Sequence, residues 1–185
     1  EQAKKVTESD CMIAVMSGSF LQRGEPAIMD KFHRTRAALH NGIDIVLELP
    51  YVYAVQNSDI FANGAVRILN EIGVNNICFG SESGDIDLFI KAYESFKEKE
   101  AIFKETLKSN LNTGISFPEA SKRAYSKIGL TNNLIDLSMP NNILGFSYVK
   151  AILENNLPII PLTIKRLKSQ YHDNIMESPI ASATS

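Results

Sequence analysis

The sequence has 185 residues, a formal net charge of -2 and 44% hydrophobic residues. This length suits one α/β domain with a sizeable core, and the small net charge excludes a global electrostatic argument for nucleic-acid binding, so any RNA contact needs a local basic surface. No stretch has the length and apolarity of a membrane span, no signal-peptide pattern is visible, and two cysteines alone argue against a disulfide framework and favour a reducing cytoplasm.

The first half of the chain alternates short apolar runs with helical patterns. A helix is expected to end within residues 1–9, and strands are predicted at 11–16, 43–47 and 76–79. Helices are predicted at 30–41, with Asp30 as N-cap, and at about 58–72. This order with short connections predicts a parallel sheet with right-handed crossovers.

The second half is mainly helical. Residues 85–111 carry a highly charged helical pattern, which predicts one or two surface helices. Ser116, followed by Pro118 and Glu119, predicts a capped helix to residue 127, and Pro140 is expected to begin a helix to about residue 155. A last strand is predicted at 159–164, and residues 171–185 are expected to be loop-like. We interpret 1–185 as a single domain with a helical insertion at about 85–127.

Polar residues follow the predicted strands, at the sheet edge where α/β proteins bind ligands. Gly18 and Gly80 are placed just after strands, where backbone N–H groups can approach a ligand closely. Arg166 follows the last strand and offers a planar donor fork for a phosphate. Asn141 or Asn142 is suited to bind a base or a ribose, but capping of the helix explains either residue equally well.

Several common kinds of site are not supported by the sequence. It has no Walker loop, no GxGxxG after a strand and no GxSxG elbow. His33, His40 and His172 lack metal-ligand spacing, so no metal site is predicted. Lys31 and Arg34 share one helix face, which is either solvated or anion-binding.

One long stretch is more informative than spacing. Residues 14–27, A-V-M-S-G-S-F-L-Q-R-G-E-P-A, closely resemble the segment after the first helix in bacterial tRNA(Met) cytidine acetate ligases, which are related to nucleotidyltransferases. Further matching blocks follow in the same order: Asp30, Lys31 and Arg34, then 44–50, 61–65, 79–82, 140–145, 171–173 and 181–184. The resemblance covers nearly the whole chain, with 88–112 as the part without a motif.

The resemblance implies a Rossmann-like nucleotidyltransferase fold, with a three-layer parallel sheet and extra helices. It implies an enzyme that uses ATP, with Mg²⁺, to activate acetate as acetyl-adenylate and then acetylates N4 of the wobble cytidine of elongator tRNA(Met). It carries ATP contacts over to Gly80, Asn141 and Arg166, with Asn142 as the alternative to Asn141. It indicates no catalytic residue in this sequence.

The sequence also departs from the family pattern. The N-terminal block with an HxGH-type signature, which contacts the triphosphate in the family, is missing, so we expect an excerpt truncated at both ends and inactive alone. A sheet that lacks a strand upstream of Glu1 would have a hole at its centre. The tRNA-contacting part is expected beyond Ser185, and Lys31 and Arg34 are hypothesised to line the acyl-adenylate pocket or the RNA path.

Two other functions remain as alternatives. One is a nucleotidyltransferase that adenylates a small phosphorylated metabolite on the same fold. The other is a non-catalytic RNA-binding module. The oligomeric state is not predicted.

Overall fold

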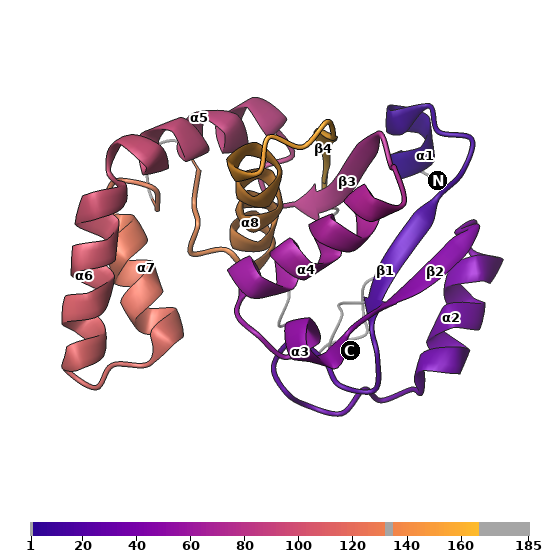
Figure 1. The fold of residues 1–185 in the computed structure, drawn as a ribbon, viewed down its shortest axis with the longest axis horizontal. Helices are drawn as coiled ribbons and strands as arrows, with labels where there is room; N and C mark the ends of the chain where they lie inside the picture. Colours follow the sequence, from indigo (N-terminus) through magenta and orange to yellow (C-terminus); the bar gives the residue numbers. More distant parts are fainter. Residues whose placement is uncertain (1, 132–134, 167–185) are drawn as a thin grey trace, which may run out of the picture.

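A computed structural model describes residues 2–131 and 135–166, and within these ranges the chain forms eight helices and four strands (Figure 1). The strands are β1 (Ile13–Ser17), β2 (Ile45–Leu49), β3 (Asn76–Ser81) and β4 (Ile160–Lys165). The helices are α1 (Gln2–Thr7), α2 (Lys31–His40), α3 (Tyr51–Ala54), α4 (Ser58–Glu71), α5 (Ile86–Glu98), α6 (Glu100–Asn112), α7 (Phe117–Lys127) and α8 (Pro140–Glu154).

The predicted elements are present, with small shifts at their ends. The short helix α3 was not predicted. The predicted strand 11–16 begins too early, because Cys11, which this range placed inside a strand, precedes β1 and is exposed. The prediction for residues 171–185, including the matching blocks at 171–173 and 181–184, falls outside the described residues.

Two predicted helix starts have different outcomes. The Asp30 carboxylate accepts hydrogen bonds from the backbone N–H groups of Phe32 and His33, so Asp30 is the N-cap of α2. Ser116 stands at the N-cap position of α7, but its side chain makes no capping hydrogen bond. The prediction of a Ser116 cap is therefore correct in position and wrong in its contact.

The four strands form two separate parallel pairs. β1 pairs with β2, with Ile13 opposite Ile45, and β3 pairs with β4, with Gly80 opposite Ile164. One sheet was predicted, but within residues 2–131 and 135–166 no strand lies between β1 and β3 to join the pairs. A cleft of about 800 Å³ lies there instead, lined by residues of both strands.

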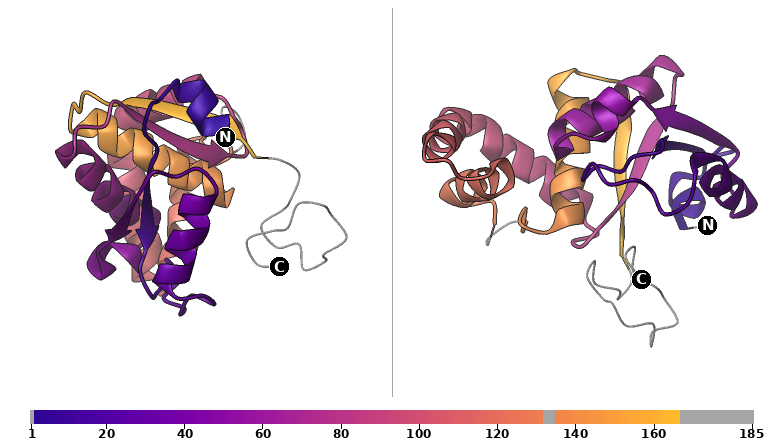
Figure 2. Two further views of the ribbon diagram at one scale, coloured as in Figure 1. Left: turned by 90° about the vertical axis from the view of Figure 1, so that its right-hand side faces the viewer. Right: turned by 90° about the horizontal axis from the view of Figure 1, so that it is seen from below.

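Helices cover both faces of the strands (Figure 2). α1 packs against β3 and β4, and α2 packs against β2. On the other side α4 packs against α8, which in turn packs against β3, β4 and α5. The main core lies here and includes Phe89, Phe96 and Phe146, all almost fully buried. This burial fixes α8, and therefore the start of α8, relative to the end of β3.

α6 and α7 form a helical pair at the far end of the molecule from β2 (Figure 1). Aromatic rings join this pair to the main core, since the ring of Phe103 lies 5.2 Å from that of Phe96, and the ring of Tyr125 lies 5.9 Å from that of Phe146. The segment 85–127 therefore shares one hydrophobic core with the rest of the described chain, and the single domain stays a prediction.

Candidate functional site

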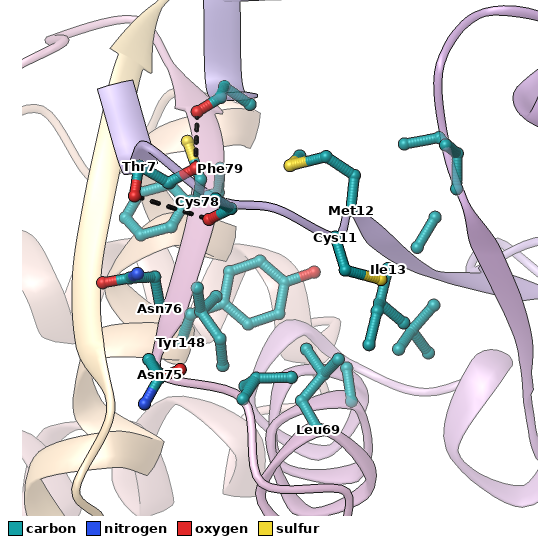
Figure 3. A pocket seen from close by; sticks show the side chains of 18 of the residues that line it. Thr7, Cys11, Met12, Ile13, Leu69, Asn75, Asn76, Cys78, Phe79 and Tyr148 are labelled. Carbon is teal, nitrogen blue, oxygen red and sulfur yellow. Dashed lines mark hydrogen bonds between the residues drawn. The ribbon is translucent and has the colours of Figure 1, made fainter. Parts of the chain in front are cut away.

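The cleft between β1 and β3 is apolar in its middle. Residues Ile13–Val15 of β1 and Asn76–Gly80 of β3 contribute to its walls, and Leu69 of α4 and Tyr148 of α8 also line it. Figure 3 shows the Tyr148 ring in the space between β3 and the segment around Cys11 and Ile13. Polar residues line both ends of the cleft. Those before β1 include Glu8 and Asp10, whereas Asn141 and Arg166 lie at the carboxyl end of β3, which is the edge where a ligand was expected.

Gly80 lies inside β3 and not in the loop after it. The predicted strand ended at Phe79, but pairing with β4 continues through Ser81, opposite Lys165. A Cβ on residue 80 would lie 3.3 Å from Cγ of Arg166. The absence of a side chain at Gly80 therefore lets the stem of Arg166 lie over the strand.

Arg166 directly follows β4 and is held there by its backbone. Its N–H donates to the carbonyl oxygen of Ser81 at 2.9 Å. Its side chain is exposed, and Nη1 donates a long hydrogen bond of 3.4 Å to Oδ1 of Asn141. Arg166 is the one cationic side chain in the described lining of the cleft.

Asn141 lies in the first turn of α8 and is bound by Glu82, which comes from the loop after β3. The Glu82 carboxylate accepts from Asn141 Nδ2 at 2.7 Å, from the Asn141 N–H at 3.2 Å and from the Asn142 N–H at 2.7 Å. The N-cap residue of α8, Met139, supplies no capping side chain. Glu82 therefore satisfies N–H groups that a helix start leaves without partners, and its negative charge suits that position.

Asn142 is 3% exposed and does not belong to the described lining of the cleft. Its Oδ1 accepts from the N–H groups of Glu82 and Ser83, both at 3.1 Å, and its Nδ2 donates to the carbonyl oxygen of Asp136. Both ends of this amide are thus bound to the protein. Of the two asparagines left open by the sequence, Asn141 is the one in the described lining of the cleft.

The turn after β3 brings these groups together. Ser81 is fully buried, and its hydroxyl hydrogen-bonds the Thr163 hydroxyl at 2.8 Å and accepts from the Gly84 N–H at 2.9 Å. Gly84 has a φ of 69°, and a Cβ there would lie 2.5 Å from Cβ of Lys165. Glycine is therefore required at position 84 by both conformation and space.

The structure places Gly80, Asn141 and Arg166 at one corner of the cleft. Sequence reasoning found no role for Glu82, although Glu82 stands within the block 79–82 that matched the family. The available signal was a carboxylate just beyond a buried strand. Its partners are 59 and 60 residues away in sequence, so no local pattern reveals them.

A second polar group lies at the carboxyl ends of β1 and β2. The Arg34 guanidinium donates to the carbonyl oxygens of Ser17, Gly18 and Met29, and Lys31 forms an ion pair with Glu48 at 2.6 Å. The described lining of the cleft includes neither cation. Arg34 therefore fixes the loop after β1, and a contact of Lys31 or Arg34 with a ligand stays a prediction.

The middle of the cleft is uncharged at neutral pH. Burial raises the pKa of the Tyr148 phenol to about 12, and burial also raises the pKa of the Cys78 thiol. The described residues contain no cluster of three or more side chains able to hold a metal ion. Over the same residues, no helix has the length and apolarity to cross a membrane.

Parallel strands with helices on both faces, and a polar corner at the carboxyl ends of two strands, define an α/β protein of the nucleotide-binding kind. The model of a protein family described as HIGH Nucleotidyl Transferase matches residues 1–185. The chain belongs to this family, and the predicted nucleotidyltransferase fold is confirmed.

Relatives that share one name match the whole chain. A protein of Oceanobacillus iheyensis is 59% identical, and one of a Geobacillus strain is 50% identical; both are named tRNA(Met) cytidine acetate ligase. Each match covers 100% of this chain and 46% of the relative. The resemblance seen in the sequence is confirmed, and the chain spans about half the length of the curated relatives it matches.

Two crystal structures of one protein are similar to most of this chain. The apo crystal structure of Thermotoga maritima TmcAL is 39% identical, with a TM-score of 0.84 over 99% of this chain and 45% of that chain. A second crystal form of TmcAL, bound with alpha-thio ATP, is 40% identical, with a TM-score of 0.79 over 90% of this chain and 42% of that chain.

Proposed function

We propose that the full-length protein is an ATP-dependent tRNA(Met) cytidine acetate ligase, and that Gly80, Asn141 and Arg166 contact its ATP. One observation carries the proposal: in a chain of the HIGH nucleotidyl transferase family, these three residues line the same corner of one cleft. The names of the relatives and the ATP analogue bound to TmcAL support the choice of substrate.

Each of the three residues offers chemistry suited to a nucleotide. Arg166 is exposed, its guanidinium has several donors, and only one long hydrogen bond to it is found within the described residues, so it is available for a phosphate. The missing side chain at Gly80 leaves room for the stem of Arg166 over β3, so Gly80 helps to place the guanidinium at this corner. Asn141 presents an amide at the edge of the cleft.

The proposed reaction has two steps. A carboxylate oxygen of acetate attacks the α-phosphorus of ATP, so that pyrophosphate leaves and acetyl-adenylate forms. The N4 amine of the wobble cytidine then attacks the acetyl carbonyl, and AMP leaves. The first step requires positioning and neutralisation of the charge that develops on pyrophosphate, which is a role for Arg166.

Mg²⁺ is proposed to enter with the triphosphate. Mg²⁺ usually keeps several waters and binds through substrate phosphates and one or two carboxylates, so a dedicated cluster of protein ligands is not required. The two free thiols suit a reducing compartment such as the cytoplasm.

We also propose that the domain is incomplete within residues 1–185. β1 and β3 face each other across the cleft, and a further parallel strand there would join the two pairs into one sheet. The chain covers 46% of its curated relatives, which leaves ample sequence for such a strand and for tRNA contacts. Residues 1–185 alone are accordingly expected to be inactive.

The test is an acetate-dependent exchange of labelled pyrophosphate into ATP by the full-length protein, followed by mass spectrometry of tRNA(Met) for N4-acetylcytidine. Exchange that requires acetate and acetylation of the wobble cytidine support the proposal. Exchange that requires a phosphorylated metabolite instead indicates an ordinary nucleotidyltransferase. RNA binding without any exchange indicates a non-catalytic module, and either result overturns the proposal.

A further inference from the structure

The carboxylate of Glu82 binds the Asn141 side chain but does not line the cleft. Asn141 and Arg166 line the cleft, whereas Glu82 is not in its described lining. Glu82 nevertheless binds the Asn141 side chain more closely than Arg166 does, at 2.7 Å against 3.4 Å. The Asn141 amide is therefore bound by an acceptor outside the lining, the Glu82 carboxylate, and by a donor within the lining, the Arg166 guanidinium.

These two neighbours determine which way the amide points. A carboxylate only accepts hydrogen bonds, so the group facing Glu82 is the Asn141 NH₂. A guanidinium only donates, so the group facing Arg166 is the Asn141 oxygen. Turning the amide over would place an oxygen against the carboxylate and an NH₂ against the guanidinium, and both contacts would be repulsive.

The start of α8 is also occupied. The N–H groups of Asn141 and Asn142, which could otherwise bind a phosphate, donate to the Glu82 carboxylate. A phosphate at this helix start would meet the negative charge of Glu82. The phosphates are therefore expected at Arg166 and not at the backbone of α8.

We infer that Glu82 is a positioning residue, which turns the Asn141 oxygen toward the cleft so that Asn141 recognises a hydrogen-bond donor on the nucleoside part of the nucleotide. This inference rests on the proposed ATP site and specifies the kind of ligand group to which Asn141 hydrogen-bonds. Two groups of ATP have the required chemistry: the 6-amino group of adenine and the ribose hydroxyls.

Three analogues distinguish these donors. Inosine triphosphate lacks the 6-amino group, 2′-deoxy-ATP lacks one ribose hydroxyl and 3′-deoxy-ATP lacks the other. Dissociation constants for ATP and each analogue are measured by calorimetry with the full-length protein. The wild type is expected to bind one of the analogues about fivefold or more weakly than ATP, the size of effect expected for one lost hydrogen bond.

Glu82→Gln keeps the shape of the side chain but replaces one acceptor by a donor. The Asn141 amide then loses its fixed orientation, and the ratio between ATP and the discriminated analogue is expected to fall toward 1. The double variant Glu82→Gln with Asn141→Asp keeps the net charge and returns an acceptor to the cleft, so the ratio is expected to recover. Glu119→Gln, an exposed glutamate on α7, is the matched control and is expected to keep the wild-type ratio.

Each result has a defined meaning. An unchanged ratio in Glu82→Gln, or no discrimination by the wild type among all three analogues, overturns the inference while leaving ATP binding intact. A wild-type protein that binds no ATP overturns the proposed function itself. Melting temperatures show whether each variant is folded.

If Glu82→Gln does not fold, NMR of the wild type decides the question. The Asn141 side-chain NH₂ is assigned by its loss in Asn141→Ala, in protein labelled with ¹⁵N asparagine. One of its two protons is expected to be shifted downfield and to exchange slowly because it is bound to a carboxylate. Two protons with the shifts and fast exchange of a free amide overturn the inference.

Discussion

Glu82 and Asn142 each bind the main chain of the other residue. The Asn142 Oδ1 accepts from the Glu82 N–H at 3.1 Å, and the Glu82 carboxylate accepts from the Asn142 N–H at 2.7 Å. This reciprocal pair joins the end of β3 to the start of α8, so it holds together the two elements that supply Gly80 and Asn141.

Asn142→Ala is expected to destabilise the fold. The change removes the partners of three backbone groups, the N–H of Glu82, the N–H of Ser83 and the carbonyl of Asp136, in a place where residue 142 is buried. Leaving buried backbone groups without hydrogen-bond partners is expected to lower the free energy of unfolding by about 1–3 kcal/mol, which urea unfolding measures. Asn141→Ala is the comparison, with a smaller loss of stability and a larger loss of ATP affinity, and the opposite ranking would show that Asn142 is the ligand-binding asparagine.

Arg166→Ala is expected to weaken ATP binding at least tenfold, since a hydrogen bond to a charged group contributes about 1.5–3 kcal/mol. Arg166→Lys retains the charge without the planar fork and should fall between alanine and the wild type. Because Arg166 is exposed, the melting temperature should change little in either variant. Equal ATP affinity in all three proteins, measured by calorimetry, would remove Arg166 from the site.

Gly80→Ala tests the close approach of the Arg166 stem. The new methyl group would meet Cγ of Arg166 at 3.3 Å, so the flexible stem must shift by a few tenths of an ångström. A loss of ATP affinity is expected that is smaller than that of Arg166→Ala, with unfolding by urea close to the wild type. If the alanine also weakens binding in an Arg166→Ala background, the methyl group acts on the ligand directly and not through the arginine.

The sequence predicted most elements because their signals are local. Asp30 caps the helix that it precedes, and Pro140 begins the helix that it was expected to begin. The contact between Asn141 and Glu82 was not predictable in this way, because it depends on α8 packing against β3. The same applies to the separation of β1 from β3, which is a property of strand pairing and not of any one strand.

The site residues also differ in whether local sequence patterns could predict them. Gly80, Asn141 and Arg166 were predicted from polar residues near strand and helix ends together with the family resemblance, and the structure brings them to one corner. The choice between Asn141 and Asn142 required the structure, since two adjacent asparagines at a helix start have the same local pattern, but only Asn141 belongs to the described lining of the cleft.

Gly145→Ala is expected to reduce stability although alanine is the better helix former. A Cβ at position 145 would lie 2.9 Å from Cδ2 of Phe79 and 3.1 Å from Cε1 of Phe89, so α8 would be forced away from β3. Such overpacking costs about 1–3 kcal/mol, more than the gain of about 1 kcal/mol in helix propensity. Thermal unfolding measures the net change in stability from these two effects. Adding Phe79→Leu to Gly145→Ala should recover part of the loss. If the losses of the two single variants simply add, a direct clash is contradicted.

Asp59 joins α4 to α8, and Asp59→Ala is expected to destabilise the fold by about 1–2 kcal/mol, a value reduced by its partial exposure. Its carboxylate accepts from the Ser147 hydroxyl at 2.7 Å and pairs with Lys150 at 2.9 Å. Asp87→Ala is the control, because Asp87 also lies in the first turn of a helix and so reports the loss of charge there alone. Equal unfolding free energies for the two variants would show that the contacts with α8 contribute nothing.

Cys78 is expected to react with iodoacetamide more slowly at neutral pH than Cys11. The thiolate is the reactive form, and burial raises the pKa of the Cys78 thiol, so its thiolate fraction at pH 7 is smaller than that of an ordinary thiol. The difference should shrink at high pH, because the rate at Cys78 keeps rising above pH 9, where an ordinary thiol with a pKa of about 8.5 levels off. The Cys11→Ser and Cys78→Ser variants isolate each thiol, and mass spectrometry of the alkylated protein gives the rates. A Cys78 rate that is low at every pH but levels off at an ordinary pKa would mean that access to the cleft, and not ionisation, limits the reaction.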